Sequence, residues 1–435
     1  MNFMSWPPRR TRSTRRRERA QRLRRDEGAR RALVAMLSLV LAIAPLAATA
    51  HESSRFAFAV VGNAIDASPT SEASAQKMID AIGRDPRISF IVYNGNLKGA
   101  SEPCSDVLYE RRQALLEASR PALIFVPGQH DWVTCSTAAS GGYDPVERLD
   151  RLRQTILSDP SSLGQNPLTL TRESEVPRFR PYRENVRWQV NDTVFVALNL
   201  PDGNNHYLNA GGRNGEFEDR VIANGFWLEH AAEYAKRHNA RAIVVFVQGN
   251  PWEFERRERS DRFAWLRFAH RPRDGYIEFR HSLAKLAQTF GGPVLVIHQD
   301  DAKLARGFEI NQPLRNEKGA TIANVTQIAV ALHDPATQWL HVDADMERRP
   351  PVRVSVRDVP KHLPPLLQPL PPLLPRDGEA PALPDMPEIS SMPDVTEIPS
   401  APQFSPPAPA PQTAPGGFAP PPQPAPPGAG AVYRN

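Results

Sequence analysis

Cysteine is scarce in this 435-residue chain, and two common catalytic signatures are missing from it. Only Cys104 and Cys135 occur, and their spacing does not match a metal-binding cysteine motif. The chain contains neither a G-x-x-x-x-G-K-[ST] phosphate loop nor a G-x-S-x-G nucleophile elbow. These absences argue against a cysteine-type zinc centre, P-loop nucleotide chemistry and the serine chemistry of α/β-hydrolases.

Acidic residues are sparse in the first 31 residues, which hold 12 Arg and only 3 Asp or Glu. This segment contributes +9 to a whole-chain net charge of +5, so the remainder of the chain carries −4. The sequence pI of about 9.3 is therefore a property of the leader. We expect no nucleic-acid surface on the body.

An apolar stretch, residues 32–50, follows the basic segment and ends in the small residues ATA. This order is typical of a secretory signal peptide, with cleavage before His51. Because the stretch is just long enough to span a bilayer and has an Arg-rich flank, an uncleaved membrane anchor is the alternative. Both interpretations predict an exported protein, periplasmic or secreted, or anchored with its body outside the cytoplasm.

The two cysteines are expected to pair, because disulfides form and persist in exported proteins. A Cys104–Cys135 bond would close a loop of about 30 residues, worth roughly 3–4 kcal/mol in the chain-entropy description. Two buried free thiols are the alternative.

Proline is concentrated near the C-terminus, where residues 350–435 hold 26 of the 45 prolines. Such a segment cannot form backbone ladders and predicts an extended or disordered tail. A solvated spacer is the simpler interpretation, and a preformed polyproline ligand for a protein or cell-envelope partner is the alternative. The predicted organisation is a leader (1–50), a folded body (51–347) and a Pro-rich disordered tail (348–435).

Strand and helix patterns alternate along the body, which predicts an α/β fold with helices on both faces of a sheet. Apolar runs predict strands at 55–62, 88–95, 121–128, 186–190, 193–200, 240–249 and 293–300. Helical spacing is found at 74–84, 106–119, 147–157, 225–239 and 277–291. Residues 325–344 are expected to form two strands of one hairpin at a sheet edge.

Ligands in such sheets bind beyond the carboxyl ends of the strands. That rule selects five short loops, at residues 62–66, 95–99, 128–132, 248–252 and 298–302. Each of these loops taken alone is an ordinary turn, but together they predict one site.

The five loops, in this order, resemble those of the calcineurin-like metallophosphoesterase family. The matching segments are "NAI" (63–65), "GN" (95–96), "GQHD" (128–131), Gln248 and "HQDDA" (298–302). Three further segments resemble motifs of an exported branch of that family: "GQHDWVTC" (128–135), "EN-x-RW" (184–188) and "N-x-P-x-x-NN" (199–205). The resemblance covers roughly residues 55–345. It implies a two-layered β sandwich flanked by helices and a centre for two divalent cations, Mn, Fe or Zn.

Most of the ligand positions that the resemblance implies hold other residues. Family members place Asp, His, Asp, Asn, His and His where this chain has Asn63, Ile65, Asn96, Gln129, Gln248 and Ala302. Neutral amides are poor substitutes for carboxylates beside transition metals, and Ile and Ala cannot ligate at all. The exported branch also carries Gln in the fourth loop, so Gln248 is weaker evidence that the metal site is lost. We expect the dimetal site to be lost and no cofactor to be bound.

A few residues keep the family identity. His130 and Asp131 could form a residual catalytic or anion-binding pair, with a structural hydrogen-bonding pair as the alternative. His298, Asp300 and Asp301 could hold a remnant metal ion, although solvated loop carboxylates are the simpler interpretation. Lys98 matches a Lys of the exported branch and is a weak candidate for phosphate binding.

Three functions follow from these residues. The favoured hypothesis is an exported pseudoenzyme that binds a partner through the old cleft or the tail. The second is an active phosphoesterase, of phosphate mono- or diesters, with a remodelled or single-metal site. The third is a structural envelope protein that uses its Pro-rich tail as a spacer. The sequence identifies no partner.

Overall fold

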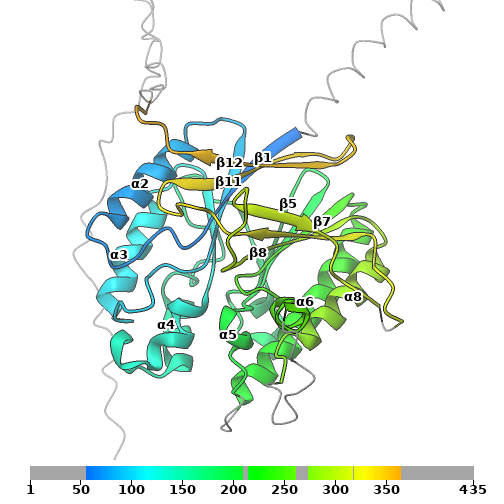
Figure 1. Cartoon of the computed structure of the whole chain (residues 1–435), viewed down its shortest axis with the longest axis horizontal. Coiled ribbons are helices and arrows are strands. Elements are labelled where there is room, and N and C mark those ends of the chain that lie inside the picture. Colours follow the sequence, from blue (N-terminus) through cyan, green and yellow to red (C-terminus); the bar gives the residue numbers. More distant parts are fainter. Residues whose placement is uncertain (1–54, 209–213, 261–272, 317, 364–435) are drawn as a thin grey trace, which may run out of the picture. The chain divides into compact units, whose positions relative to one another are not determined.

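The computed structural model describes residues 55–208, 214–260, 273–316 and 318–363 (Figure 1). The predicted leader and the predicted tail from residue 364 onwards lie outside these ranges. Within the described ranges, no helix has both the length and the apolar character needed to cross a membrane.

The first sheet has five strands in the order β12-β11-β1-β2-β3. Its strands are β1 (Arg55–Val61), β2 (Ile88–Asn94), β3 (Ala122–Val126), β11 (Gln338–Asp345) and β12 (Val352–Asp358). β1, β2 and β3 run parallel, whereas β11 and β12 add antiparallel strands at one edge. The parallel strands are apolar on both faces and almost wholly buried, as strands covered on both sides must be.

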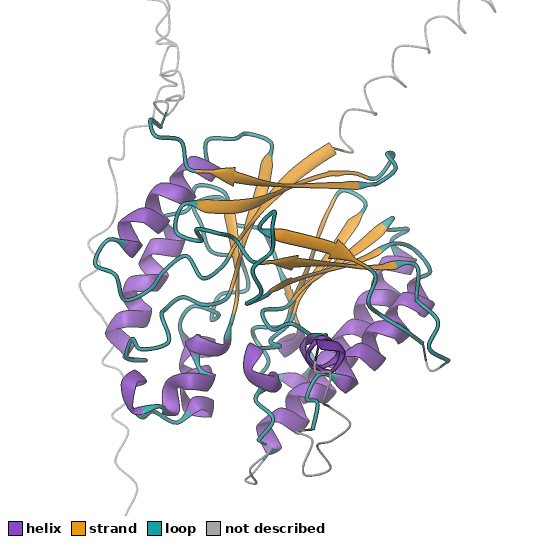
Figure 2. Ribbon diagram, viewed as in Figure 1, coloured by secondary structure: helices purple, strands orange, loops and turns teal. Residues whose placement is uncertain are grey.

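Helices α2 (Ser71–Ile82), α3 (Asp106–Glu117) and α4 (Pro145–Gln154) pack on the outer face of this sheet (Figures 1 and 2). Local signals set where two of them begin. Ser105 caps α3 by accepting a hydrogen bond from the backbone of Leu108. Asp144 caps α4 in the same way, just before a proline at the first helical position.

The second sheet has seven strands in the order β4-β5-β6-β7-β8-β10-β9. These are β4 (Thr171–Arg172), β5 (Val186–Val190), β6 (Thr193–Ala197), β7 (Ala242–Phe246), β8 (Val294–Gln299), β9 (Phe308–Asn311) and β10 (Val325–Val330). Helices α6 (Gly215–Arg237) and α8 (Ile277–Phe290) cover its outer face. Shorter helices are α5 (Asp202–Asn205) and α7 (Glu253–Ser260), with 3-10 turns at 129–131, 133–136, 138–140, 173–175 and 177–179.

Aromatic side chains fill the space between the two sheets. Phe58 of β1 stacks on Phe90 of β2 with ring centroids 5.1 Å apart, and it meets Phe246 of β7 edge-on at 5.9 Å. Trp188 and Phe195 complete the layer at 5.3 Å from each other. Four layers therefore result: helices, sheet, sheet and helices (Figure 2). The alternating pattern correctly predicts a mixed α/β protein, but each sheet has helices on one face only.

The predicted hairpin at residues 325–344 is wrong. β10 pairs in parallel with β8 and antiparallel with β9 in the second sheet, whereas β11 pairs with β1 and β12 in the first. The segment between them crosses from one sheet to the other. Strand pairing over long sequence separations is decided by packing, which a local apolar pattern does not encode.

The predicted boundary between body and tail is also too early. β12 lies within the segment assigned to the tail, and it pairs with β11 from Val352↔Ala344 to Asp358↔Gln338. Its alternate residues Val352, Val354 and Val356 pack against the layer between the sheets. The prolines at 350 and 351 precede this edge strand, where they remove no ladder hydrogen bond.

Candidate functional site

The structure brings the five loops together at the carboxyl ends of the strands. Asn63 N donates to Gly95 O at 2.9 Å, and Gly95 N donates to Val126 O at 2.9 Å, which joins the loops of the first sheet. Gln299 N donates to Gln248 O at 3.0 Å and joins two loops of the second sheet. These bonds join the loops within each sheet, as the order of the parallel strands predicts.

Two glycines allow these loops to approach closely. Gly95 adopts a φ of +61°, and a Cβ there would lie 2.4 Å from Cγ of Gln248. A Cβ on Gly128 would lie 2.3 Å from Oδ1 of Asn96. A side chain at Gly95 would displace Gln248 of the other sheet, and one at Gly128 would displace Asn96 of the same sheet.

The two asparagines at implied metal positions bond to each other. Nδ2 of Asn96 donates to Oδ1 of Asn63 at 2.8 Å, and the backbone N of Asn96 lies 3.4 Å from the same oxygen. The other amide atom of Asn96, Oδ1, accepts from the backbone N of His130 at 2.8 Å. Each oxygen that could face a cation therefore already accepts a hydrogen bond from nitrogen.

Gln248 ties the two sheets together with its side-chain oxygen. Oε1 accepts from the backbone N of Gln129 at 3.0 Å and from the backbone N of Asp202 at 2.7 Å. Only 4% of Gln248 is exposed. Gln129 contributes its backbone to this contact, while its side chain lies against Gly203. Both glutamines therefore serve as bridges between loops.

The remaining substituted positions have no capacity to ligate. Ile65 is buried and belongs to the core cluster under α2 and α3. Ala302 contributes a backbone N that donates to Oδ1 of Asp300 at 2.8 Å. Ile65, at the position of the first-loop His in the resembled family, is therefore part of the hydrophobic core.

Asp131 is a buried structural carboxylate. Its oxygens accept from the backbone N of Leu97 at 2.6 Å and of Gly128 at 2.7 Å, and its own carbonyl accepts from the Tyr109 hydroxyl at 2.7 Å. Burial raises the pKa of Asp131 to about 7, against the opposing effect of the two backbone donors. Asp131 therefore joins the second and third loops rather than facing a ligand.

Lys98 and His130 lie beside this carboxylate. Lys98 is 1% exposed, and its Nζ donates to Gly99 O at 2.9 Å. Burial lowers the pKa of Lys98, partly offset by Asp131 and Glu102. His130 is half-buried, and burial together with the Lys98 charge lowers its pKa, so its imidazole is neutral at pH 7. Of the residues proposed for catalysis or phosphate binding, His130 is the most accessible.

His298 and Asp300, the predicted remnant ligands, are each engaged elsewhere. The buried His298 ring has Nδ1 at 2.7 Å from Gln299 O and Nε2 at 3.4 Å from Oε1 of Gln327. The carboxylate of Asp300 accepts from Arg256 at 2.6 Å and from Asn250 at 2.8 Å. Asn250 lies in the fourth of the five selected loops, but Arg256 lies outside all of them, so the sequence gives no signal for Arg256.

The residues at this site do not fit a pair of divalent cations. Two dications need carboxylates and imidazoles with free lone pairs. Here neutral amides accept from N–H groups, and the Asp300 carboxylate is paired with an arginine. In the described parts of the chain, no three His, Cys, Asp or Glu side chains form a group that could hold a metal ion.

Comparisons with known proteins add little to this description. No family model matches the sequence, and no curated protein matches it. A purple acid phosphatase isolated from yellow lupin (Lupinus luteus) seeds aligns at 11% identity over 70% of this chain and 54% of its own, with a TM-score of 0.36. A hypothetical protein from Thermus thermophilus aligns at 11% identity over 69% of this chain and 98% of its own, with a TM-score of 0.30. At these TM-scores neither likeness supports an argument about function.

A cavity of about 480 Å³ opens beside the amide network. Its lining includes Asn63, Gln299, Asp301, Lys303 and His333. Gln299 is 7% exposed and its Nε2 has no hydrogen-bond partner among the described residues. An unpaired buried donor costs about 1–3 kcal/mol.

The predicted disulfide is confirmed. Cys104 and Cys135 are bonded, with Cα atoms 5.7 Å apart, and both residues are fully buried. The bond fixes the segment that follows His130 and Asp131 to the start of α3. It is also compatible with an oxidising compartment.

Proposed function

We propose that this protein is an exported pseudoenzyme, built on a metallophosphoesterase-like fold, that binds a ligand and does not hydrolyse phosphoesters. The observation that supports this proposal most directly is the 2.8 Å hydrogen bond between Asn96 Nδ2 and Asn63 Oδ1. In the resembled family both positions hold Asp, and two carboxylates could not make this contact. The amide pair replaces a charge-balanced cation site with a neutral, self-satisfied network.

The ligand of the proposed pseudoenzyme is expected to be a small polar molecule in the cavity beside the network. The exposed Asn63 in the lining would offer polar atoms to that ligand. Asp301 and Lys303 at the rim offer one charge of each sign, while Ala331 and Leu332 offer apolar contacts. Small-molecule sites commonly combine a few convergent polar groups with apolar walls in this way.

Metal content and phosphodiester turnover, measured on the same purified protein, test this proposal. We expect well under one equivalent of Mn, Fe or Zn by elemental analysis, and no hydrolysis of bis(p-nitrophenyl) phosphate above buffer with or without added Mn²⁺. Near-stoichiometric metal in the wild-type protein would contradict the proposal. The variant Asn63→Asp/Ile65→His/Asn96→Asp/Ala302→His, which restores four family residues, is expected to bind more metal than the wild type.

An active phosphoesterase with a remodelled site is the alternative function. It is supported by the accessible His130, whose neutral imidazole is suited to proton transfer near pH 7. This alternative requires turnover that His130→Ala abolishes. Turnover that survives both His130→Ala and a chelator would instead indicate a contaminating enzyme.

A structural role in the cell envelope remains a proposal based on the composition of the tail. Because β12 belongs to the folded body, the informative truncation removes residues 364–435 and keeps 352–358. We expect this truncation to change the partners that are recovered by cross-linking in cells. An identical set of partners would remove the structural hypothesis.

A further inference from the structure

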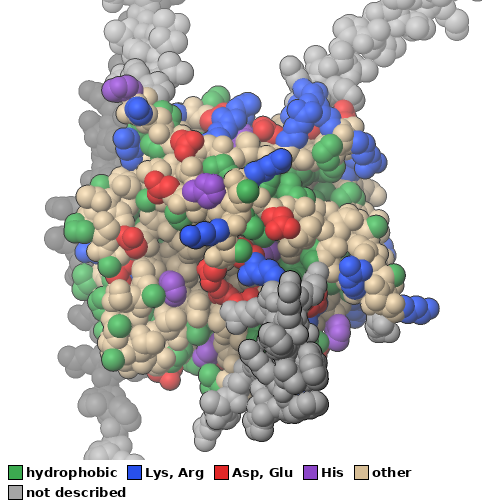
Figure 3. Space-filling model, in the orientation of Figure 1, with side chains coloured by type: hydrophobic (Ala, Val, Ile, Leu, Met, Phe, Trp, Pro, Cys, Tyr) green, Lys and Arg blue, Asp and Glu red, His purple; other side chains and the backbone are tan. Residues whose placement is uncertain are grey.

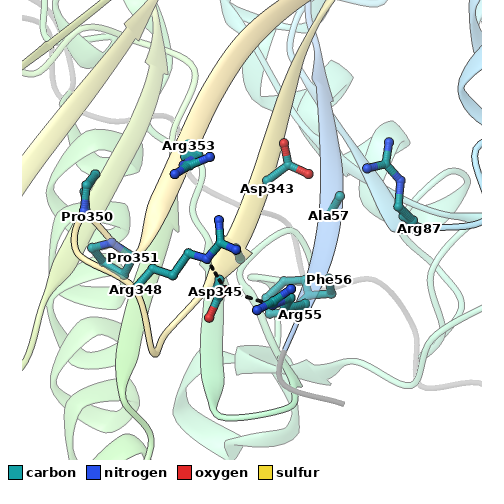
Figure 4. Close-up of a pocket in the computed structure, with 11 residues that line it drawn as sticks. Arg55, Phe56, Ala57, Arg87, Asp343, Asp345, Arg348, Pro350, Pro351 and Arg353 are labelled. Atoms are coloured by element: carbon teal, nitrogen blue, oxygen red, sulfur yellow. Dashed lines mark ion pairs between the residues drawn. The ribbon is translucent and has the colours of Figure 1, made fainter. Parts of the chain in front are cut away.

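A second cavity lies at the opposite end of β1 from the candidate site. It measures about 420 Å³ and is lined by residues at the start of β1, the end of β11 and the start of β12 (Figure 4). β1 runs seven residues from Arg55 at this cavity to Val61 at the candidate site, which separates the two by roughly 20 Å. The chemistry of the two cavities is therefore independent.

Four arginines line this cavity, which we call the arginine pocket. They are Arg55, Arg87, Arg348 and Arg353, and among the described residues the only acidic ones in the lining are Asp343 and Asp345. The same described lining contains no lysine. Lys and Arg side chains recur along the corresponding rim of the molecule in Figure 3. The described residues of the lining have a formal charge of +2, although the chain after residue 31 has a net charge of −4.

The acidic residues do not satisfy all four guanidinium groups. Asp345 pairs with both Arg55 and Arg348, at 2.9 Å each, so two cations share one carboxylate (Figure 4). Arg87 pairs with Asp85, outside the lining, at 2.8 Å. Among the described residues, Arg353 makes no ion pair within 4.0 Å, although its cross-strand neighbour is Asp343.

Asp343 is the second acidic residue of the pocket, and its charge opposes the binding of an anion. Its Oδ1 lies 3.2 Å from Nε2 of His341, a buried residue on the same strand. Burial and the Arg357 charge lower the pKa of His341, so the ring is neutral at pH 7 and donates a hydrogen bond without a charge. Asp343 and the small side chain of Ala57 lie between Arg353 and Arg87 in Figure 4.

We propose that the arginine pocket binds a phosphate-bearing anion. Planar guanidinium groups match phosphate oxygens in a bidentate geometry, and several of them around one cavity define a phosphate site better than point charges do. The phosphate group could belong to the headgroup of an anionic phospholipid or to a soluble phosphate. If residues 32–50 stay uncleaved as a membrane anchor, the lipid source is favoured. Arg55 would then lie within at most about 18 Å of extended chain from the end of the apolar segment at residue 50.

The test uses the full chain and two probes, inorganic phosphate and vesicles of phosphatidylcholine with or without 30% phosphatidylglycerol. Arg87→Gln/Arg353→Gln removes two charges from the pocket. Arg180→Gln, at an exposed arginine outside the pocket, is the control. Because every variant keeps the basic leader, any binding of lipid by residues 1–31 is the same in all of them.

We expect the double variant to lose at least about tenfold in affinity for phosphate, for phosphatidylglycerol vesicles or for both, while the control changes by less than about twofold. Loss for phosphate alone identifies a soluble ligand, and loss for vesicles identifies a headgroup. Asp343→Asn removes a negative charge and should strengthen binding severalfold, which keeps the proposal testable if the double variant unfolds. Binding that is absent in the wild type, or that falls equally in the control, would overturn it.

Discussion

Oδ1 of Asn63 lies 2.8 Å from Nδ2 of Asn96, so the first and second loops of the candidate site are held together by one amide pair. The same Asn96 side chain receives the backbone N of His130 through its oxygen. One residue therefore connects three loops, and its amide is needed because it donates on one side and accepts on the other. A carboxylate would satisfy only the accepting side.

The substitution Asn96→Asp is expected to destabilise the protein. It places a carboxylate oxygen against Oδ1 of Asn63 in a site that is 4% exposed, and it removes a donor. We expect a loss of about 1–3 kcal/mol in the free energy of unfolding, measured by urea denaturation. Asn166→Asp, which removes one hydrogen bond at an exposed residue, is the control and should cost less than about 0.5 kcal/mol. Equal effects for the two variants would contradict the structural role of the amide pair.

Gly128→Ala should disturb the same network through packing. The new Cβ would lie 2.3 Å from Oδ1 of Asn96 and 2.9 Å from Cγ of Gln248, so at least one of these side chains must move. We expect a loss of about 1–3 kcal/mol, seen as a lower melting temperature. Gly215→Ala, where a Cβ meets nothing within 4 Å, should be neutral or slightly stabilising. A melting temperature unchanged by Gly128→Ala would show that the loops are loosely packed.

Removal of the disulfide should be costly. The bond joins Cys104 to Cys135 across a sequence separation of 31. We expect Cys104→Ser/Cys135→Ser to lose about 3–4 kcal/mol of stability by urea denaturation, because the unfolded chain gains entropy. Intact mass under denaturing conditions, with and without reductant, should differ by two hydrogens for the wild type. Two alkylatable thiols in the unreduced wild-type protein would refute the pairing.

Glu173 is expected to make stability depend on pH. Burial raises the pKa of Glu173 from 4.5 to about 8, and Glu184 adds to that shift while the Asn185 amide opposes it. A raised folded pKa means that the contribution of Glu173 is full below about pH 4.5 and is lost as pH rises through about 8. Glu173→Gln resembles the protonated form, so this loss should vanish.

We expect Glu173→Gln to be more stable than the wild type at pH 8 by up to the order of 4 kcal/mol, and nearly equal to it at pH 4.5. Urea denaturation at the two pH values measures the difference. Glu117→Gln at an exposed position of α3 is the control, with a change below about 0.5 kcal/mol at both. A Glu173→Gln effect that is the same at both pH values would indicate a packing change instead.

Local features of the sequence predict much of this fold. Strands such as β7 are short runs of β-branched and aromatic residues that are buried on both faces, so their apolar character is visible along the chain. Helix α3 begins at Asp106, where the helical spacing predicts it. Helix α4 begins at Pro145, two residues before the predicted start at 147, because Asp144 caps it. The grouping of the loops within each sheet also follows from the sequence, because the carboxyl ends of parallel strands share one edge of a sheet. The meeting of the two groups depends on how the two sheets pack.

The sequence by itself determined which residues occupy the implied ligand positions, and so that the carboxylates needed for two cations are missing from them. Only the tertiary structure decided what those residues do instead. The amide pair of Asn63 and Asn96, the contact of Arg256 with Asp300 and the separation of β10 from β11 into different sheets join segments far apart in the chain. Hydrogen bonds and ion pairs depend on distances below about 3.5 Å and on direction. Such geometry is set only when the two sheets pack.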